Sequence, residues 1–269
     1  MSVLRAILLG LLQGFTEFLP VSSSGHLTLI PWFLHWEDPG LTFDALVHLG
    51  TLVAIVFYFW ADILALLRAW WDSLRTRQAK TTEARLAWLI ILSAIPAGLL
   101  GFFLEDFFEQ LFAAPLAVSI LLLVTGGLIW ISERLGRRVM PLAQMGWRDA
   151  LSIGVAQGFA IAPGISRSGA TISAGLLRGL ERDAAARFSF LMVIPVIAGA
   201  AGFQMLDAVS AGLSLADGLS LVAGFMAALV SGYVAIRFLL GYVRQHSLRP
   251  FAYYVWAVGL LGIALSVLR

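Results

Sequence analysis

Long apolar runs alternate with short polar segments along the chain. Six of the runs hold about 18 to 20 residues with almost no charge. At 1.5 Å per residue this is the length of a helix that crosses a hydrocarbon core of about 30 Å. The six runs cover residues 43–60, 86–104, 114–132, 188–206, 218–236 and 250–268. The pattern predicts six transmembrane helices.

Two further apolar segments are interrupted by polar loops. Residues 3–33 are broken at 19–25, and residues 150–177 are broken at 162–169. Each segment predicts a helix, a tight loop and a second helix. Such a segment can enter a membrane and return on the same side if its loop is buried in protein or lines a wet cavity. We therefore expect an all-α integral membrane fold with six transmembrane helices and two re-entrant helix-loop-helix hairpins.

The two broken segments match each other at a fixed offset of 144 residues. Of the sixteen positions from 10 to 25, seven recur, whereas unrelated sequences would share about one. The pairs are Gly10 and Gly154, Gln13 and Gln157, Gly14 and Gly158, Phe15 and Phe159, Ser22 and Ser166, Ser24 and Ser168, and Gly25 and Gly169. We interpret this as a duplication within a single membrane domain, 1–269, with repeat one over about 1–133 and repeat two over about 148–268.

Each predicted hairpin is followed by three spans. Because three is odd, the second repeat should be inverted relative to the first. One hairpin then enters from each side of the membrane, and the two loops can meet near the midplane.

Composition supports a membrane protein. The chain is 60% hydrophobic and 13% charged, with a mean hydropathy of +0.90, and soluble domains are less apolar and more charged. A net charge of +2 does not indicate a nucleic-acid partner. The absence of cysteine excludes disulfides and thiolate nucleophiles. We interpret the N-terminal apolar run as mature protein rather than a signal peptide, because it contains Gln13 and Glu17 and has no small-residue cleavage site.

The distribution of charge predicts the orientation. Cytoplasmic loops of membrane proteins are enriched in Lys and Arg. With the loop after the first span inside, 15 of the 18 basic residues are cytoplasmic: Arg68, Arg75, Arg77, Lys80, Arg85, Arg134, Arg137, Arg138, Arg148, Arg178, Arg182, Arg187, Arg237, Arg244 and Arg249. The opposite loops contain Glu37, Asp38, Glu105, Asp106, Glu109, Asp207 and Asp217. The three exceptions are Arg5, Arg167 and Arg269, and both chain ends are predicted to lie outside.

The first loop contains a candidate metal site. Gln13 and Glu17 are four residues apart and therefore share one helix face. An oxygen-only pair suits a hard cation such as Mg²⁺ or Ca²⁺. The structural alternative is that both side chains bond the polar loop beside them. Carboxylates at membrane depth are costly and usually functional, which favours the metal site.

A serine cluster follows, with Ser22, Ser23 and Ser24 before Gly25 and His26. In this setting His26 could act as a general acid or base, or as a nucleophile. We interpret the three other histidines, which lie in a span or near an interface, as structural; they are His35, His48 and His246.

The second loop has the features of an anion site. Glycine and serine before a helix expose backbone N–H groups at its N-terminus. Arg167 adds a planar guanidinium that can bind a phosphate through two hydrogen bonds. Ser166, Ser168 and Thr171 are the candidate partners for the remaining phosphate oxygens. Arg167 could instead be a structural tie to Glu17, and the two roles can coexist.

The loop motifs resemble those of a known family, the bacterial undecaprenyl-pyrophosphate phosphatases linked to bacitracin resistance. The stretches 13–17 (QGFTE), 21–26 (VSSSGH) and 163–171 (PGISRSGAT) carry the resemblance, which extends over essentially the whole chain. It implies Mg²⁺- or Ca²⁺-dependent removal of the terminal phosphate from the C55 carrier lipid, in the bacterial inner membrane, with the active site open to the outer face. The resemblance is also compatible with a homodimer. Gln13 is neutral, so a second charged metal ligand is missing.

The expected mechanism uses both loops. Glu17 and Gln13 hold the divalent ion, and Arg167 binds the phosphate together with Ser22 and the second-loop hydroxyls. Ser23 is the first choice as nucleophile with His26 as its proton partner, and direct attack by His26 or by water stays open. A lipid-phosphate transporter or flippase is the alternative function, since inverted repeats with broken hairpins are typical of transporters. A type-2 phosphatidic-acid phosphatase is excluded, because that family needs a histidine soon after its Ser-Arg, and the first histidine after Arg167 is His246.

Overall fold

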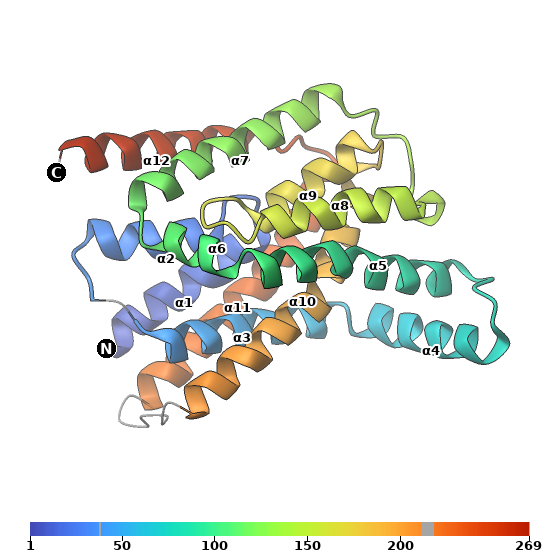
Figure 1. Ribbon diagram of the computed structural model, residues 1–269, viewed down its shortest axis with the longest axis horizontal. Helices are drawn as coiled ribbons and strands as arrows, with labels where there is room; N and C mark the ends of the chain where they lie inside the picture. Colours follow the sequence, from blue (N-terminus) through green and yellow to red (C-terminus); the bar gives the residue numbers. More distant parts are fainter. Residues whose placement is uncertain (38, 211–217, 269) are drawn as a thin grey trace.

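The computed structural model describes residues 1–37, 39–210 and 218–268. In this part of the chain the regular structure is helical, apart from one isolated bridge between Met140 and Leu180. The helices are α1 Val3–Phe18, α2 Ser23–Phe33, α3 Leu41–Tyr58, α4 Trp60–Thr76, α5 Thr82–Phe103, α6 Glu105–Phe112, α7 Pro115–Leu135, the 3₁₀ turn η1 Leu142–Gln144, α8 Trp147–Phe159, α9 Arg167–Leu177, α10 Arg182–Ser210, α11 Gly218–Tyr242 and α12 Arg249–Leu268 (Figure 1).

Five of the described helices are long and apolar enough to cross a membrane: α3, α5, α7, α11 and α12. Many large apolar side chains on them point outward, including Phe57, Phe102 and Val222. Apolar residues on the outer face of a helix are stable in lipid but not in water. The chain is therefore a multi-pass membrane protein, and five of the six predicted spans coincide with these helices. The sixth, at 188–206, lies inside α10, where the side chains of most residues after Gly199 are outside the described part.

Both predicted breaks are present. Between α1 and α2 the chain turns at residues 19–22, and between α8 and α9 it turns at residues 160–166. Both second helices begin with the same cap: Ser22 Oγ accepts from Gly25 N at 3.2 Å, and Ser166 Oγ accepts from Gly169 N at 3.1 Å. A serine at this position satisfies an N–H that the helix itself leaves free.

The first helix of each hairpin packs closely on another helix of the molecule, α1 on α11 and α8 on α5. Two glycines at equivalent positions allow the close approach. A Cβ atom on Gly10 would lie 2.3 Å from the carbonyl oxygen of Gly224, and one on Gly154 would lie 2.3 Å from that of Ser93. Gly10 and Gly154 are separated by the 144-residue offset of the sequence match.

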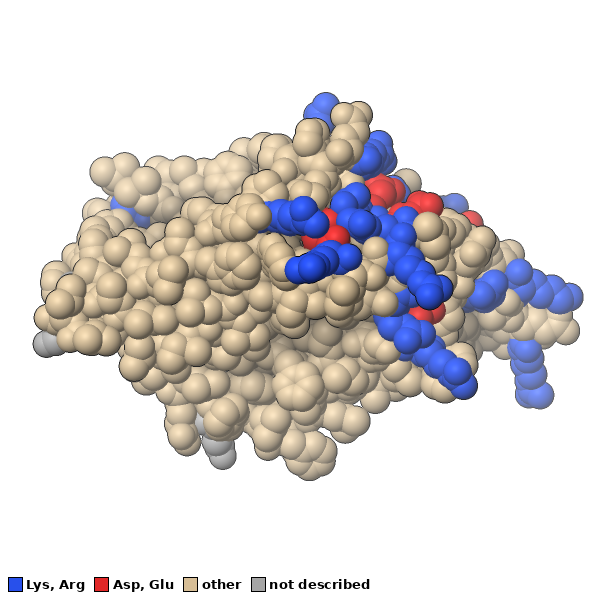
Figure 2. Space-filling model, turned by 90° about the horizontal axis from the view of Figure 1, so that it is seen from above, with Lys and Arg blue, Asp and Glu red and all other residues tan. Residues whose placement is uncertain are grey.

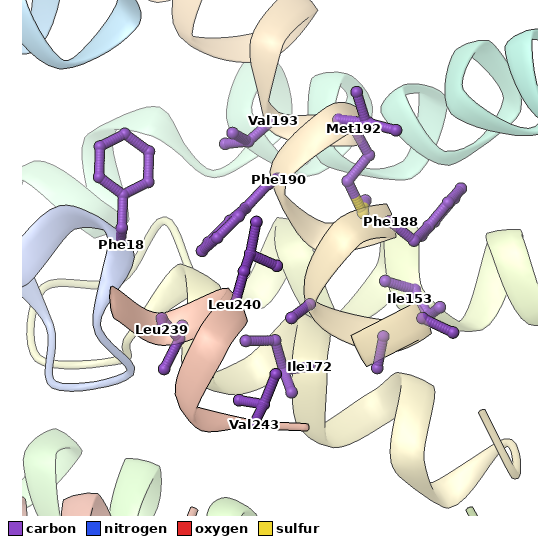
Figure 3. Packing of buried hydrophobic residues seen from close by; sticks show 14 of the residues in the cluster. Phe18, Ile153, Ile172, Phe188, Phe190, Met192, Val193, Leu239, Leu240 and Val243 are labelled. Atoms are coloured by element: carbon purple, nitrogen blue, oxygen red, sulfur yellow. The ribbon is translucent and has the colours of Figure 1, made fainter. Parts of the chain in front are cut away.

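The largest hydrophobic cluster surrounds the first half of α10 (Figure 3). Phe188, Phe190 and Met192 are buried in this cluster, which also contains side chains of α9 and α11. Phe18, at the end of α1, packs edge-on against Phe190 with 5.5 Å between ring centroids. This contact fixes the end of α1 beside α10 and so positions the adjacent Glu17.

Basic residues gather at one end of the molecule (Figure 2). The N-terminus and the end of α12 lie at the opposite end, as Figure 1 shows. Within the basic end, the buried carboxylate of Glu133 accepts from Arg138 at 2.8 Å and from Arg182 at 2.6 Å. The gathering of basic residues agrees with the predicted sorting of Lys and Arg. Of the charged residues used in that prediction, Asp38, Asp217 and Arg269 lie outside the described residues, as do the side chains of Glu105, Asp106, Glu109 and Asp207.

The segment predicted as a loop after the first span is mostly helical between residues 68 and 85. Helix α4 runs through Trp60–Thr76 and α5 begins at Thr82, so that only a short turn joins them. Helix α4 buries Leu66 and Ser73, and the Ser73 hydroxyl accepts from Trp88 Nε1 of α5 at 3.0 Å. The helix is amphipathic, so charged residues interrupt its sequence and it contains no long apolar run like those of the predicted spans.

Candidate active site

The loops of the two broken hairpins contact each other. Arg167 Nη2 donates to Glu17 Oε1, although 150 residues separate them in the chain. Two further hydrogen bonds join the loops: Ser168 Oγ donates to the carbonyl of Leu19 at 3.0 Å, and Gly164 N donates to Ser24 Oγ at 3.4 Å. The sequence-predicted residues of both loops are therefore brought to one place.

Glu17 is at the centre of this site. Its side chain is 2% exposed, and its other oxygen, Oε2, accepts from Ser23 Oγ at 2.7 Å and from Gln13 Nε2 at 3.0 Å. A buried carboxylate is stable only when charge and hydrogen bonds compensate the loss of water. Arg167 supplies the charge, and Ser23 and Gln13 supply hydrogen bonds. The predicted spacing of Gln13 and Glu17 on one face of α1 is confirmed by their contact.

The donor set fits a hard divalent cation. Gln13 Oε1 is buried and has no hydrogen-bond partner within the described residues, so an amide oxygen beside the Glu17 carboxylate is available to a ligand. No group of three or more His, Cys, Asp or Glu that could hold a metal is found in the described part of the chain. Mg²⁺ commonly takes only one or two carboxylates from the protein and completes its shell with water and substrate phosphate. Glu17 and Gln13 fit that mode.

Ser23 and His26 both lie in the first turn of α2, but they form no hydrogen bond with each other. The Ser23 hydroxyl donates to Glu17, while His26 Nδ1 is 2.8 Å from the Ser22 carbonyl and Nε2 is 2.8 Å from Tyr254 Oη. The expected pairing of Ser23 with His26 is therefore not formed in this structure. Both His26 nitrogens are occupied by other groups, because the ring lies between α2 and α12.

The second loop is held by backbone and hydroxyl contacts. Thr125 of α7 donates to the carbonyl of Gly164 at 2.9 Å and accepts from Ser166 N at 2.9 Å. Gly164 has φ +95°, and a Cβ atom there would lie 2.3 Å from the carbonyl oxygen of Val118. Only glycine suits such a position. These contacts fix the loop that presents Arg167 to Glu17.

The hydroxyls predicted to bind phosphate are mostly occupied by protein groups. Ser22 and Ser166 cap their helices, and Ser168 is bonded to the first loop. Thr171 Oγ1 is 2.8 Å from the Arg167 carbonyl and 2.6 Å from Ser189 Oγ, so it faces α10. In this structure Ser168 joins the two loops, Ser22 and Ser166 cap the helices that follow them, and Thr171 joins α9 to α10.

A small cavity lies where the loops meet α10. It leaves about 10 Å³ for the centre of a water molecule, which is room for about one water. A phosphate group is larger than one water molecule, so the cavity as it stands does not enclose a phosphate. The lining residues are Glu17, Phe18, Arg167, Ser168, Ser189, Phe190 and Val193. Among them Arg167 is partly accessible, since its side chain is 25% exposed.

Three polar residues of the site were missed by sequence reasoning: Thr125, Ser189 and Tyr254. Each lies in a predicted span, where a single hydroxyl is common and usually bonds its own helix. Their partners are distant in sequence, 228 residues away for Tyr254 and His26. No local signal marks them, and only the packing of α7, α10 and α12 on the hairpins reveals them.

The fold and the site together define a multi-pass membrane protein in which two helix-loop-helix segments build one buried site from a carboxylate, an arginine and serine hydroxyls. Residues 6–261 match the family model described as "Bacitracin resistance protein BacA". The chain belongs to this family.

Relatives named undecaprenyl-diphosphatase support the assignment over the full length. The protein of Thermomicrobium roseum is 44% identical over 269 residues, which cover 97% of each chain. That of Rubrobacter xylanophilus is 46% identical over 271 residues, and that of Moorella thermoacetica is 44% identical over 270 residues; both alignments cover 100% of each chain.

Proposed function

We propose that the protein is an undecaprenyl-diphosphatase, which hydrolyses the terminal phosphate of undecaprenyl pyrophosphate and leaves the monophosphate carrier lipid used in cell-wall synthesis. The observation that carries the proposal is the direct contact of Arg167 with Glu17 at the junction of two serine-rich loops. An arginine, a carboxylate and hydroxyls in one buried site suit phosphoryl transfer, in which most of the catalysis is positioning and charge stabilisation. The names of the full-length relatives point to the same substrate.

Arg167 is assigned to the phosphate. Its guanidinium can bind two phosphate oxygens at once and stabilise the charge that develops during transfer. Binding requires the side chain to exchange part of its contact with Glu17 for the substrate. Ser22, Ser166, Ser168 and Thr171 are assigned to the remaining phosphate oxygens, and Ser168 also joins the two loops through the Leu19 carbonyl.

Glu17 and Gln13 are assigned to a divalent cation, Mg²⁺ or Ca²⁺. When bound, the ion would neutralise charge on the pyrophosphate oxygens. The unpartnered Oε1 of Gln13 and the carboxylate of Glu17 support this assignment.

Ser23 is assigned as the nucleophile. Its oxygen attacks the terminal phosphorus, the bond to the bridging oxygen breaks, and undecaprenyl phosphate leaves. Because Ser23 already donates to Glu17 Oε2, Glu17 is placed to accept the hydroxyl proton first. Water then cleaves the phosphoserine and releases phosphate, with His26 as the proton partner of this second step. Direct attack by His26 or by water is the alternative.

The finer topology is also a proposal. It comprises six spans and two re-entrant hairpins in an inverted repeat, within the bacterial inner membrane and with the site open to the outer face. The shared serine caps, the equivalent glycine contacts and the gathering of basic residues at one end support it. A homodimer remains an expectation from the family resemblance.

Phosphate release from undecaprenyl pyrophosphate by the purified protein tests the function. We expect turnover with Mg²⁺ or Ca²⁺, loss of turnover in excess chelator, and recovery when the ion is restored. Glu17→Gln should lose most activity, and added ion should recover little of it. Full activity in strong chelator would refute the metal assignment. Lipid binding without any phosphate release would refute the enzyme and indicate a transporter.

A further inference from the structure

Tyr254 covers one side of His26. It lies in the first third of α12, is 47% exposed, and directs its hydroxyl at a histidine that is 2% exposed. The distance from Tyr254 Oη to His26 Nε2 is 2.8 Å. The two rings are parallel within 2°, with 5.6 Å between centroids.

The hydrogen bonds on the two sides of the imidazole fix its protonation pattern. The Ser22 carbonyl, 2.8 Å from Nδ1, can only accept, so Nδ1 carries the hydrogen. In a neutral ring Nε2 then has a free electron pair and accepts from the Tyr254 O–H. Two elements hold the ring in this way, the turn before α2 through Ser22 and α12 through Tyr254.

We propose that Tyr254 is a positioning residue for His26: its phenol donates to Nε2 and, together with the Ser22 carbonyl, holds the imidazole in the Nδ1–H form, in which Nε2 is the basic nitrogen. A histidine can work as acid or base through one nitrogen only if the other is fixed in orientation and protonation. The Ser22 carbonyl fixes the hydrogen on Nδ1, and the Tyr254 hydroxyl fixes the orientation of Nε2. The inference rests on the role proposed for His26 in phosphate release.

A purely structural role is the competing explanation, because the parallel rings also pack on each other. The substitution Tyr254→Phe distinguishes the positioning role from the structural role. It keeps the ring and its packing but removes the hydroxyl that reaches Nε2. Tyr253→Phe is the matched control, since the neighbouring Tyr253 is 56% exposed and packs against Trp256 on the same helix.

The first measurement is steady-state phosphate release. Tyr254→Phe should lower kcat about fivefold to tenfold, the size expected for one hydrogen bond, with KM changed by less than about twofold. Tyr253→Phe should match the wild type in kcat and KM. In a His26→Ala background, Tyr254→Phe should have no further effect, because Tyr254 acts through the missing ring.

The second measurement is the ¹⁵N spectrum of histidine-labelled protein in detergent, with the His26 signals assigned by their loss in His26→Gln. The wild type should show Nδ1 protonated and Nε2 unprotonated, and Tyr254→Phe should gain a population with hydrogen on Nε2. This readout does not depend on turnover.

The outcomes separate the two proposals. If His26→Ala keeps wild-type activity, the role proposed for His26 fails. If His26→Ala is inactive while Tyr254→Phe retains kcat within about twofold of the wild type, or if wild-type His26 carries its hydrogen on Nε2, the positioning role of Tyr254 is overturned.

Discussion

The Glu17 carboxylate shows what the single residue contributes to this site. One of its oxygens meets Arg167 and the other meets Ser23 and Gln13. Removing any one partner would leave part of a buried charge uncompensated, which costs several kcal/mol in typical proteins. The same four groups therefore determine both local stability and reactivity. A substitution at any of these four residues therefore needs a measurement of folding as well as a measurement of activity.

Ser23→Ala tests the nucleophile at this scale. If Ser23 attacks the phosphorus, turnover should fall on the order of 10³-fold or more, because no other hydroxyl of the site contacts Glu17 in the described structure. Phosphate release by the purified variant measures this. Ser132→Ala is the control, since that buried hydroxyl bonds the Ile129 carbonyl of its own helix at 2.9 Å. Near-normal turnover of Ser23→Ala would transfer the role to His26 or to water.

At the scale of elements, the two broken hairpins have the same construction but different chemistry. At the offset of 144 residues, Gln157 is equivalent to Gln13, and Ile161 is equivalent to Glu17. Gln157 is 1% exposed, and neither of its amide atoms has a partner in the described part of the chain. The second hairpin thus keeps the amide of the first without the carboxylate, and its contribution to the site is Arg167 instead.

Gln157→Leu should therefore raise stability while preserving activity. Removing an unpaired buried amide recovers a desolvation cost of about 1 to 3 kcal/mol, and leucine has a similar volume. Thermal unfolding in detergent and phosphate release measure the two effects. Gln13→Leu is the comparison and should lose activity. A lower unfolding temperature or a loss of turnover in Gln157→Leu would show that its amide has a role.

Sequence patterns predicted the hairpins and five spans because each depends on local signals: apolar length, a polar break, and a serine three residues before a glycine. They did not predict α4, whose apolar face is narrow, or the contacts of Tyr254, Ser189 and Thr125. Those contacts depend on which helices become neighbours, and that is a property of packing rather than of spacing. The structure also does not contain the expected hydrogen bond between Ser23 and His26, because Tyr254 of α12 is bonded to the imidazole.

At the scale of the whole molecule, charge is sorted along the long axis. Basic residues gather at the end where α4 joins α5, and the N-terminus and the end of α12 lie at the other end (Figures 1 and 2). Positive charge is retained in the cytoplasm during insertion. The α4–α5 turn should therefore be cytoplasmic and the N-terminus external.

Cysteine labelling tests this orientation without background, since the chain has no cysteine. Thr76→Cys, in an exposed position at the end of α4, should react with an impermeant maleimide only after cells are permeabilised. Ser2→Cys, exposed before α1, should react in intact cells. The reverse pattern would invert the topology and remove the basis for a site that opens outward.

The central claim is that Arg167 of one hairpin and Glu17 of the other form a single phosphate-transfer site, and the most direct test is phosphate release from undecaprenyl pyrophosphate by Arg167→Lys. Lysine keeps the charge that Glu17 requires but loses the planar pair of donors. We predict a folded variant whose kcat/KM is about 10- to 100-fold lower, or worse, and close to that of Arg167→Ala. Near-normal release by Arg167→Lys would contradict the account, because Arg167 would then be only a structural partner of Glu17.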